Sequence, residues 1–282
     1  MKLATVVVLY HPDVSVADNI ASYAKLSDFL YIWDNTPGRS PNVFYTELNG
    51  KNEVANHPSV KCLHCQHQNM GLAYAYNRAI EEAEKDGATH LMTMDQDSCF
   101  EKFDVFINAV GQNGEKSVGM FVPPINNSNV ESNKEVSWAA QSGCVFDMEL
   151  IHRVGMFRED FFIGMVDAEL QLRAQVAGYK MIQVGGCNLV HHVGSGRNVS
   201  FLGKTIQVSD YGPLRHYYDS RNRILMWKEF PGDYDTKGKI KFFWGRLKVM
   251  VKILLFEKNK ARKIVAIARG TWNGLLGRTR QY

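Results

Sequence analysis

The sequence contains no uninterrupted apolar run of about 18 residues, so it predicts no membrane-spanning helix. Its five cysteines form no dense framework, and their odd number fits a reducing compartment better than a disulfide-rich secreted protein. Internal repeats, low-complexity segments and an N-terminal Gly-rich, Lys-containing phosphate loop are also absent, and the missing loop argues against a nucleotidylyltransferase. What remains is an ordinary globular chain of 282 residues, with 45% hydrophobic and 22% charged residues.

The N-terminus is basic and then apolar, a pattern that a signal peptide shares. His11-Pro12-Asp13 interrupts the apolar run early, and no small-residue cleavage site follows it. A buried first strand over residues 3–9 explains the run better. We therefore expect the protein to stay in the cytoplasm.

The net charge of +4 is divided unevenly along the chain. Residues 237–282 contain 13 Lys and Arg against one acidic residue, so this segment carries about +12 and the remainder about −8. Apolar residues recur there at the spacing of one helix face: Phe243, Trp244, Leu247, Met250, Val251, Leu254 and Leu255. Two interpretations stay open, a helix packed on the body and a basic amphipathic helix that rests on an anionic membrane. Both can hold for different faces of the segment.

Apolar, β-branched runs alternate with helical patterns through the first part of the chain. Strands are expected at 3–9, 29–33, 60–64 and 90–94, with helices at 14–26 and after 69; later helices are expected at 103–110, 148–154 and 167–177, and strands at 118–123 and 180–184. This alternation predicts an α/β protein with a parallel, doubly wound sheet, which binds ligands beyond the carboxyl ends of its strands. Four polar residues follow such ends and are expected to line one crevice: His11, Asp34, Asn69 and Asp95.

Two aspartates, Asp95 and Asp97, follow the fourth predicted strand with only Gln96 between them. In an extended segment their carboxylates point the same way. Such oxygen ligands suit Mg²⁺ or Mn²⁺, and substrate phosphates usually complete the coordination. The same spacing also occurs in ordinary turns. His191 or His192 is a candidate further ligand, and on an extended segment only one of the two can face the site.

The segment from Cys62 to His67 contains two cysteines and two histidines, which invites a zinc interpretation. Structural zinc sites, however, combine a close pair of ligands with a second, distant pair, and this segment lacks that spacing. Strand alternation explains the segment better, so we expect no zinc there.

Asp167 opens a predicted helix after an aromatic, glycine-containing loop. The helix dipole favours an acidic residue at this position, which accounts for Asp167 without any function. The functional alternative is a general base that removes a proton from an attacking hydroxyl. Glu169 lies on a different helix face, where it would contact an acceptor or support the loop, and Arg173 is placed to pair with it.

Taken together, these segments resemble the family 2 glycosyltransferases with the GT-A fold, and within them the bacterial rhamnosyltransferase-like branch. The matching segments keep the family's order over roughly residues 1–230: Val-Val-Val-Leu-Tyr-His-Pro at 6–12, Trp-Asp-Asn at 33–35, and then 69–77, 94–98, 143–146, 155–162, 166–173, 178–179, 191 and 217–223. One departure is Val166-Asp167, where many members have Glu-Asp, so the support for the aspartate differs here. For Tyr217, Arg221 and Asn222 the resemblance implies no role that we can derive.

The resemblance implies a GT-A type, Rossmann-like, mostly parallel sheet flanked by helices, with a C-terminal basic helical appendage. It places a glycosyltransferase domain at 1–230, with a nucleotide-binding half (1–100) and an acceptor-binding half (101–230), and a basic amphipathic tail at 231–282. The implied roles are donor binding for Tyr10, His11, Asp34, Asn69, Gly71 and Asp95; metal binding for Asp95, Asp97 and His191; catalysis, as the base, for Asp167; and acceptor binding for Trp138 and Glu169. Asp34 would hydrogen-bond the pyrimidine base of the donor, and the metal would be Mn²⁺ or Mg²⁺.

The implied activity is an inverting, metal-dependent transfer of a sugar, with rhamnose as one candidate, from a dTDP- or UDP-linked donor to a saccharide or lipid-linked saccharide in cell-surface polysaccharide synthesis. Through residues 237–282 the enzyme would rest on the anionic inner face of the bacterial cytoplasmic membrane. The alternative is a catalytically inactive nucleotide- or sugar-binding module of the same fold. No nucleic-acid partner is expected, because the basic tail carries no evident base-reading motif. The sequence leaves the oligomeric state open, a homodimer included.

Overall fold

The computed structural model describes residues 1–38, 40–64, 68–127, 129–192, 196–201, 203–232, 236–279 and 282. By its packing the chain divides into two compact units. The first unit comprises residues 1–159 and 167–192, and the second comprises 160–166 and 193–282. The sequence predicts a glycosyltransferase domain at 1–230 and a tail at 231–282. Packing alone does not test this functional division, so it stays a prediction.

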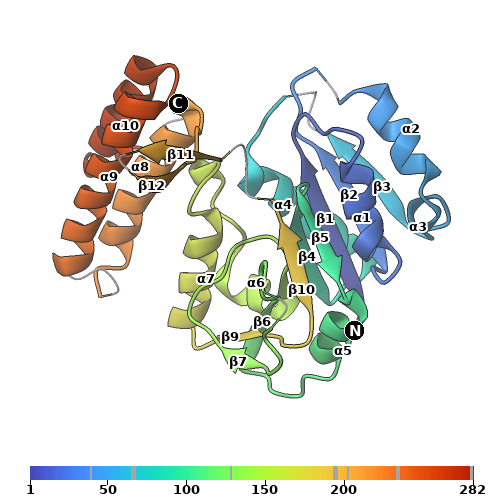
Figure 1. The fold of residues 1–282 in the computed structure, drawn as a ribbon. Coiled ribbons are helices and arrows are strands. Elements are labelled where there is room, and N and C mark those ends of the chain that lie inside the picture. The colour runs from blue at the N-terminus through green and yellow to red at the C-terminus, as the bar shows by residue number, and fades with distance from the viewer. Residues whose placement is uncertain are drawn as a thin grey trace. The chain divides into compact units, whose positions relative to one another are not determined.

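The first unit is built on a mixed, largely parallel sheet (Figure 1). Over the described residues its strand order is β3-β2-β1-β4-β8-β6-β9-β7. The strands are β1 (Leu3–Leu9), β2 (Phe29–Asp34), β3 (Val60–His64), β4 (His90–Asp95), β6 (Val118–Val122), β7 (Lys134–Glu135), β8 (Cys144–Asp147) and β9 (Lys180–Gln183). β1 pairs in parallel with both β2 and β4, and β2 pairs in parallel with β3, whereas β8 runs antiparallel to β4 and β6. The predicted α/β architecture is confirmed.

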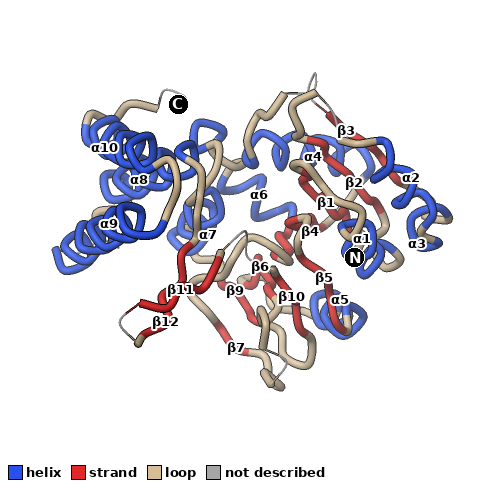
Figure 2. The backbone as a smooth tube through the Cα atoms, turned by 45° about the horizontal axis from the view of Figure 1, so that its top comes forward, coloured by secondary structure: helices blue, strands red, loops and turns tan. Residues whose placement is uncertain are grey.

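The helices of this unit flank the sheet, and a small second sheet lies beside it (Figures 1 and 2). They are α1 (Val16–Ala24), α2 (Asn42–Gly50), α3 (Asn52–Ala55), α4 (Leu72–Asp86), α5 (Phe103–Gly111), α6 (Met148–Val154) and α7 (Val166–Val176). A 3₁₀ turn, η1 (Glu159–Phe161), begins at the last residue of the first unit before Asp160. The second sheet pairs β5 (Ser98–Glu101) with β10 (Asn188–His191) in antiparallel register. Every residue of β1 is buried, as expected for a parallel strand covered on both faces.

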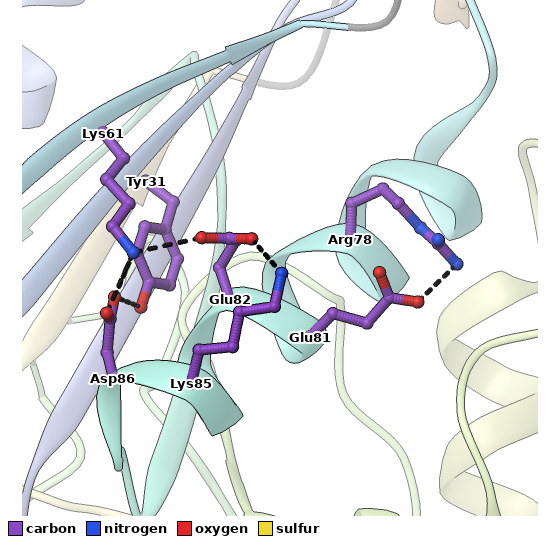
Figure 3. A network of polar contacts seen from close by, with 7 residues as sticks. All are labelled: Tyr31, Lys61, Arg78, Glu81, Glu82, Lys85 and Asp86. Atoms are coloured by element: carbon purple, nitrogen blue, oxygen red, sulfur yellow. Dashed lines mark hydrogen bonds and ion pairs between the residues drawn. The ribbon is translucent and has the colours of Figure 1, made fainter.

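A network of charged side chains fastens α4 to the edge of the parallel strands (Figure 3). Lys61 of β3 donates hydrogen bonds to Glu82 at 3.0 Å and to Asp86 at 2.7 Å, and the Tyr31 hydroxyl of β2 donates to Asp86 at 2.6 Å. The helix then ends at Gly87, whose φ of 73° suits a left-handed C-cap. These pairs are partly exposed, so their main effect is to fix the register of α4 against the strands.

The second unit groups three helices with a β-hairpin. It contains β11 (Arg197–Phe201), β12 (Lys204–Val208), α8 (Pro213–Glu229), α9 (Thr236–Phe256) and α10 (Lys260–Leu275), and both views show the helices side by side (Figures 1 and 2). α10 reaches α8 through two glycines: a Cβ at Gly270 would overlap the carbonyl oxygen of Tyr217, and one at Gly274 would lie 2.9 Å from the carbonyl oxygen of Arg221. The predicted C-terminal basic helices are therefore present, and α10 packs tightly on α8.

Ion pairs also hold the helices of the second unit together. The buried Lys263 of α10 contacts Glu257 at 2.7 Å and Asp210 at 2.6 Å, and Arg246 of α9 pairs with Asp219 of α8. Two of the cations of the basic tail are thus used internally. In the described part of the chain, no helix combines the length and the apolar character that crossing a bilayer requires.

Gly270→Ala is expected to destabilise the second unit by about 2–3 kcal/mol, because the added methyl group meets backbone that cannot move aside without separating α8 from α10. The matched control is Gly245→Ala in α9, where an added Cβ has open space and should be neutral or stabilising by up to about 1 kcal/mol. Thermal unfolding of both variants measures the difference. Equal midpoints for the two variants would contradict the close helix contact.

Candidate active site

The parallel strands reverse their order between β1 and β4, and the ends of these two strands are tied together. The Tyr10 N–H donates to the side-chain oxygen of Gln96 at 2.7 Å, and the Gln96 amide donates back to the Tyr10 carbonyl at 3.1 Å. Asn19 of α1 also donates to the Gln96 carbonyl at 2.8 Å. A reversal of this kind opens a crevice at the carboxyl edge of the sheet, where ligands bind α/β proteins. Gln96 holds that edge, although the sequence pattern draws attention only to its two aspartate neighbours.

Asp95, Asp97 and His191 converge at this edge. Each offers a ligand atom within 4.8 Å of the others, and all three side chains are half-buried. Asp95 and Asp97 were expected on one extended segment, and this expectation is wrong. β4 ends at Asp95, the chain turns at Gln96 and Asp97, and β5 begins at the next residue. The turn itself, rather than strand alternation, brings the carboxylates together.

A chain of hydroxyl groups connects Asp95 with His191. The Asp95 N–H donates to the Ser142 hydroxyl at 3.1 Å, and Ser142 donates to the buried Ser98 hydroxyl at 2.8 Å. Ser98 is in turn joined to Nδ1 of His191 by a short hydrogen bond, and this nitrogen lies 3.7 Å from the Asp97 carboxylate. The pairing of β10 with β5 sets His191 directly opposite Ser98. Ser98 and the pairing of β10 with β5 therefore fix the orientation of the imidazole beside Asp97.

The donor set of this cluster fits a divalent cation. Two carboxylates supply the oxygen ligands that Mg²⁺ and Mn²⁺ prefer, and an imidazole beside them favours Mn²⁺ of the two. His191, and not His192, belongs to the cluster; His192 is exposed, and its N–H donates to the Asp97 carbonyl at 3.0 Å. Of the segment considered for zinc, residues 65–67 lie outside the described residues, and Cys62 is exposed.

Asp34, at the end of β2, organises the loop that follows it. The N–H groups of Thr36 and Ser40 donate to its carboxylate at 3.0 and 2.9 Å, and the hydroxyls of Ser40 and Tyr45 donate at 2.8 Å each. Burial alone would raise the pKa of Asp34, but these donors outweigh it and hold the pKa below its usual value. Each carboxylate oxygen already accepts two hydrogen bonds, so the carboxylate has no acceptor position left for a nucleobase. The predicted base contact of Asp34 is untested, and this geometry favours a role in shaping the pocket.

The other predicted donor-side residues lie at neighbouring chain ends. Asn35, which the sequence analysis did not single out, joins β2 to the start of α4, because its side chain accepts from the Met70 N–H at 2.9 Å and donates to the Gly71 carbonyl at 3.2 Å. Asn69 accepts from the Gly71 N–H at 3.0 Å, and Gly71 has a φ of 86° that a side chain would strain. His11 follows β1, and its N–H donates to Thr36 at 2.9 Å.

Asp167 lies in the first turn of α7, where the helix dipole favours its charged form. The charges of Asp167 and Asp95 both act on one buried side chain, Tyr76 of α4. Burial raises the pKa of Tyr76, and the charges of Asp95 and Asp167 both raise it further. Because such effects fall off with distance, each of the two aspartates lies within electrostatic reach of Tyr76 in the first unit.

The two predicted acceptor residues differ sharply in exposure. Glu169 is buried, and both of its oxygens accept from Arg173, at 2.6 and 2.7 Å, which favours the supporting role over a direct acceptor contact. Trp138 is 64% exposed. The backbone beside it is fixed by Gln171 of α7, which accepts from the Ala139 N–H at 3.2 Å and donates to the Ala139 carbonyl at 3.0 Å. The indole therefore stands on a fixed segment, open to a ligand.

Two solved structures share this fold. Mannosyltransferase PcManGT from Pyrobaculum calidifontis, in complex with GDP-Man and Mn²⁺, matches with a TM-score of 0.57 and 13% identity over 97% of this chain and 75% of that chain. GalNAc-T7, with UDP, GalNAc and Mn²⁺, matches with a TM-score of 0.56 and 12% identity over 82% of this chain and 49% of that chain, so this chain spans about half the length of that protein. Identities this low show the fold alone.

The fold, together with sequence similarity, defines a glycosyltransferase of the GT-A fold. A sequence relative is the dTDP-rhamnosyl transferase RfbF of Shigella flexneri, which is 24% identical over 250 residues, or 80% of this chain and 79% of the relative. No family model matches the chain.

Asp34→Asn is expected to lower the free energy of unfolding by about 2 kcal/mol at pH 7, because the ionised carboxylate accepts four hydrogen bonds in the fold. A carboxyl whose folded-state pKa is lowered stabilises the protein above its unfolded pKa of about 3.9 and loses that contribution as the pH falls through the folded value. The gap between wild type and variant should therefore be constant from about pH 7 to 5 and narrow below about pH 4.

Urea unfolding at each pH measures this gap. The matched control is Asp104→Asn on the exposed face of α5, which should change the free energy of unfolding by less than about 0.5 kcal/mol at every pH. A gap for Asp34→Asn that stayed constant down to the acid transition would contradict the role given to its ionised form.

Proposed function

We propose that this chain transfers a sugar, with inversion, from a nucleotide-diphospho-sugar to an acceptor hydroxyl. The observation that carries the proposal is a candidate metal site at the carboxyl edge of the sheet, supported by a further carboxylate in the same unit. The site is the Asp95, Asp97 and His191 cluster, and the further carboxylate is Asp167, whose charge acts on the same buried tyrosine as that of Asp95. A leaving diphosphate and an attacking hydroxyl require these two kinds of group at a short distance from each other.

Asp97, Asp95 and His191 would hold the cation, Mn²⁺ or Mg²⁺. When bound, such a cation neutralises negative charge on the departing diphosphate. Tyr10 and His11 at the end of β1, and Asn69 and Gly71 before α4, would line the donor pocket. Asp34 would act there by fixing the loop at residues 34–40.

Asp167 would act as the general base. Its carboxylate takes the proton of the acceptor hydroxyl as the oxygen forms a bond to the anomeric carbon. The bond from that carbon to the diphosphate oxygen breaks on the opposite face, and its electron pair leaves with the nucleoside diphosphate. One displacement of this kind inverts the anomeric centre, and a positioned base typically contributes a factor of about 10²–10⁴.

The sequence relative supports the choice of donor, and an exposed tryptophan supports the choice of acceptor. The name of the Shigella flexneri relative supports a dTDP-linked sugar, rhamnose among the candidates, with UDP-sugars as the second choice. The exposed Trp138 offers an apolar face of the kind on which sugar rings stack, so the acceptor would be a saccharide or a lipid-linked saccharide. This acceptor class fits a role in cell-surface polysaccharide synthesis. The alternative is a binding module of the same fold without turnover.

Two substitutions separate catalysis from donor binding. Asp167→Asn should lower turnover by about 10²–10⁴-fold and leave Mn²⁺-dependent binding of the donor nucleotide within twofold of wild type, about the reproducibility of a titration. Asp97→Asn should instead abolish the gain in nucleotide affinity that Mn²⁺ gives. The measurements are nucleotide release from a panel of dTDP- and UDP-sugars, and titration with dTDP or UDP with and without Mn²⁺.

The exposed Asp104→Asn variant is the control and should match wild type in both assays. Near-normal release by Asp167→Asn would refute the assignment of the base. Nucleotide affinity that ignores Mn²⁺ in the wild type would refute the metal site. Binding without release from any sugar nucleotide would favour the inactive module.

The second unit would attach the enzyme to an anionic membrane surface. Large apolar side chains of α9 and α10 are exposed, including Trp244 at 60% and Trp272 at 61%, together with Leu247, Val251, Leu254 and Leu255. Lys248, Lys258 and Lys260 are exposed among them. Tryptophan and leucine beside lysine is the composition of helices that lie in the headgroup region, and each basic residue near an anionic leaflet contributes about 1 kcal/mol. This location would be the inner face of the cytoplasmic membrane, where lipid-linked acceptors are exposed to nucleotide-sugars.

Removing residues 237–282 would also remove α10, which packs on α8, so point substitutions test this attachment better. Trp244→Ser combined with Leu255→Ser should weaken binding to vesicles of phosphatidylcholine and phosphatidylglycerol at least about tenfold, since each exposed apolar side chain gains about 1.5–3 kcal/mol on burial. Val43→Ser, at an exposed apolar position on α2, is the control and should bind like wild type. Co-sedimentation at two salt concentrations gives the measurement. Unchanged binding of the double variant, or tighter binding to DNA than to these vesicles, would contradict the proposal.

A further inference from the structure

The loop that leads into Asp167 has an unusual backbone. Residues 155–165 connect α6 to α7, and four of them have positive φ values. Two are Gly155 and Gly164, but Phe162 and Met165, at 58° and 62°, carry side chains that disfavour this region. A strained backbone of this kind persists only where surrounding contacts enforce it.

The upstream half of the loop is held by two side chains of the first unit. Asn77 of α4 donates to the Phe157 carbonyl at 2.9 Å and accepts from the Phe157 N–H at 2.9 Å. Arg173 of α7 donates to the carbonyls of Gly155 at 3.2 Å and Met156 at 2.8 Å. Residues 155–157 therefore have backbone partners before the chain passes into the second unit.

The downstream half is held by α8 within the second unit. The side-chain amide of Asn222 donates to three carbonyls of the loop, those of Phe161 at 2.9 Å, Ile163 at 3.2 Å and Gly164 at 2.7 Å. Arg221 donates to the carbonyl of Asp160. Tyr218, on the same helix, stacks on the Phe162 ring with centroids 4.9 Å apart. Phe162 and Gly164 thus lie within the stretch that α8 holds, and Met165 follows it directly.

Arg221 also fixes the orientation of Asn222. Two of its N–H groups donate to the side-chain oxygen of Asn222, at 3.0 and 2.8 Å, and both side chains are fully buried. With its oxygen held in this way, the amide of Asn222 can only present its N–H₂ group to the loop. Residues 160–166 lead directly into Asp167, so a change in this stretch changes where the carboxylate of Asp167 is presented.

We infer that Asn222 and Arg221 are positioning residues for Asp167: they hold the loop before α7 in the left-handed conformation that presents the base to the acceptor. This inference rests on the proposed function, because it requires Asp167 to be the base. It also gives a role to a segment, residues 217–223, whose resemblance to the rhamnosyltransferase-like branch implied none.

Asn222→Asp is the sharpest variant. The new carboxylate still accepts hydrogen bonds from Arg221 but has no N–H to donate to the three carbonyls. The loop therefore loses these hydrogen bonds, while the side-chain volume in the core is unchanged. Turnover should fall by about 10²-fold, the loss expected for a displacement of about 1 Å at a catalytic group. Affinity for dTDP or UDP with Mn²⁺ should stay within twofold of wild type, and hydrogen exchange should rise in residues 160–166. Arg221→Lys, which keeps the charge but loses the planar fork, should lower turnover by about tenfold.

Ser220→Ala is the matched control, since Ser220 is a fully buried neighbour on the same helix whose hydroxyl has no hydrogen-bond partner among the described residues. It should keep wild-type turnover. Faster hydrogen exchange in the loop of Asn222→Asp with unchanged turnover would overturn the inference. A joint fall in turnover, nucleotide affinity and melting temperature would also overturn it, because that result indicates a structural role only. Near-normal turnover of Asp167→Asn would instead refute the proposed function. Loss of turnover in Asp167→Asn but not in Asn222→Asp would refute the inference alone.

Discussion

The parallel pairing of β1 with β2 on one side and β4 on the other is the constraint on which the active site depends. It brings the carboxyl ends of three strands to one edge, so residues far apart in the sequence, such as Asp34 and Asp95, follow neighbouring strand ends. The strand order reverses between β1 and β4, and such a reversal leaves a crevice at this edge. Gln96 then ties the two ends together through the backbone of Tyr10. Without this pairing neither the metal ligands nor the donor-side loops would share a surface.

Most polar side chains around the site hold backbone groups and leave few atoms free for substrate. Asp34 fills all its acceptor positions with the loop that follows it and with Tyr45 of α2. Asn35, Asn77 and Gln171 each join one element to another through a carbonyl and an N–H. Buried polar groups of this kind must be satisfied, and once satisfied they specify one arrangement of the loops. The groups proposed for chemistry are the candidate metal cluster of Asp95, Asp97 and His191, and Asp167. Such a division favours a preorganised site over one that assembles around its substrate.

The sequence predicts the elements that local pattern controls. The bounds of β1, β3 and α6 agree with expectation, because a continuous apolar run or a helical period marks each of them. It does not predict β5, which is short and follows a turn directly, although β5 supplies Ser98 and aligns His191 from 93 residues away. Nor does it predict the use of Asn222, since the three acceptors of that side chain are backbone carbonyls, which leave no trace in residue identity. The local sequence pattern therefore predicts neither the pairing of distant strands nor hydrogen bonds from side chains to backbone carbonyls.

The second unit shows how one basic, amphipathic segment serves two purposes at once. Gly270 and Gly274 turn the narrow side of α10 toward α8. Arg246 pairs with the partly buried Asp219, and Lys263 pairs with the buried Glu257. The broad apolar side, with its tryptophans, is left facing outward beside the remaining lysines. A helix that served only to cover the body would place these large residues inside, because their burial gives most of the free energy of packing. The two interpretations drawn from the sequence are therefore compatible: one side of the tail builds the fold, and the other is available for a surface outside the protein.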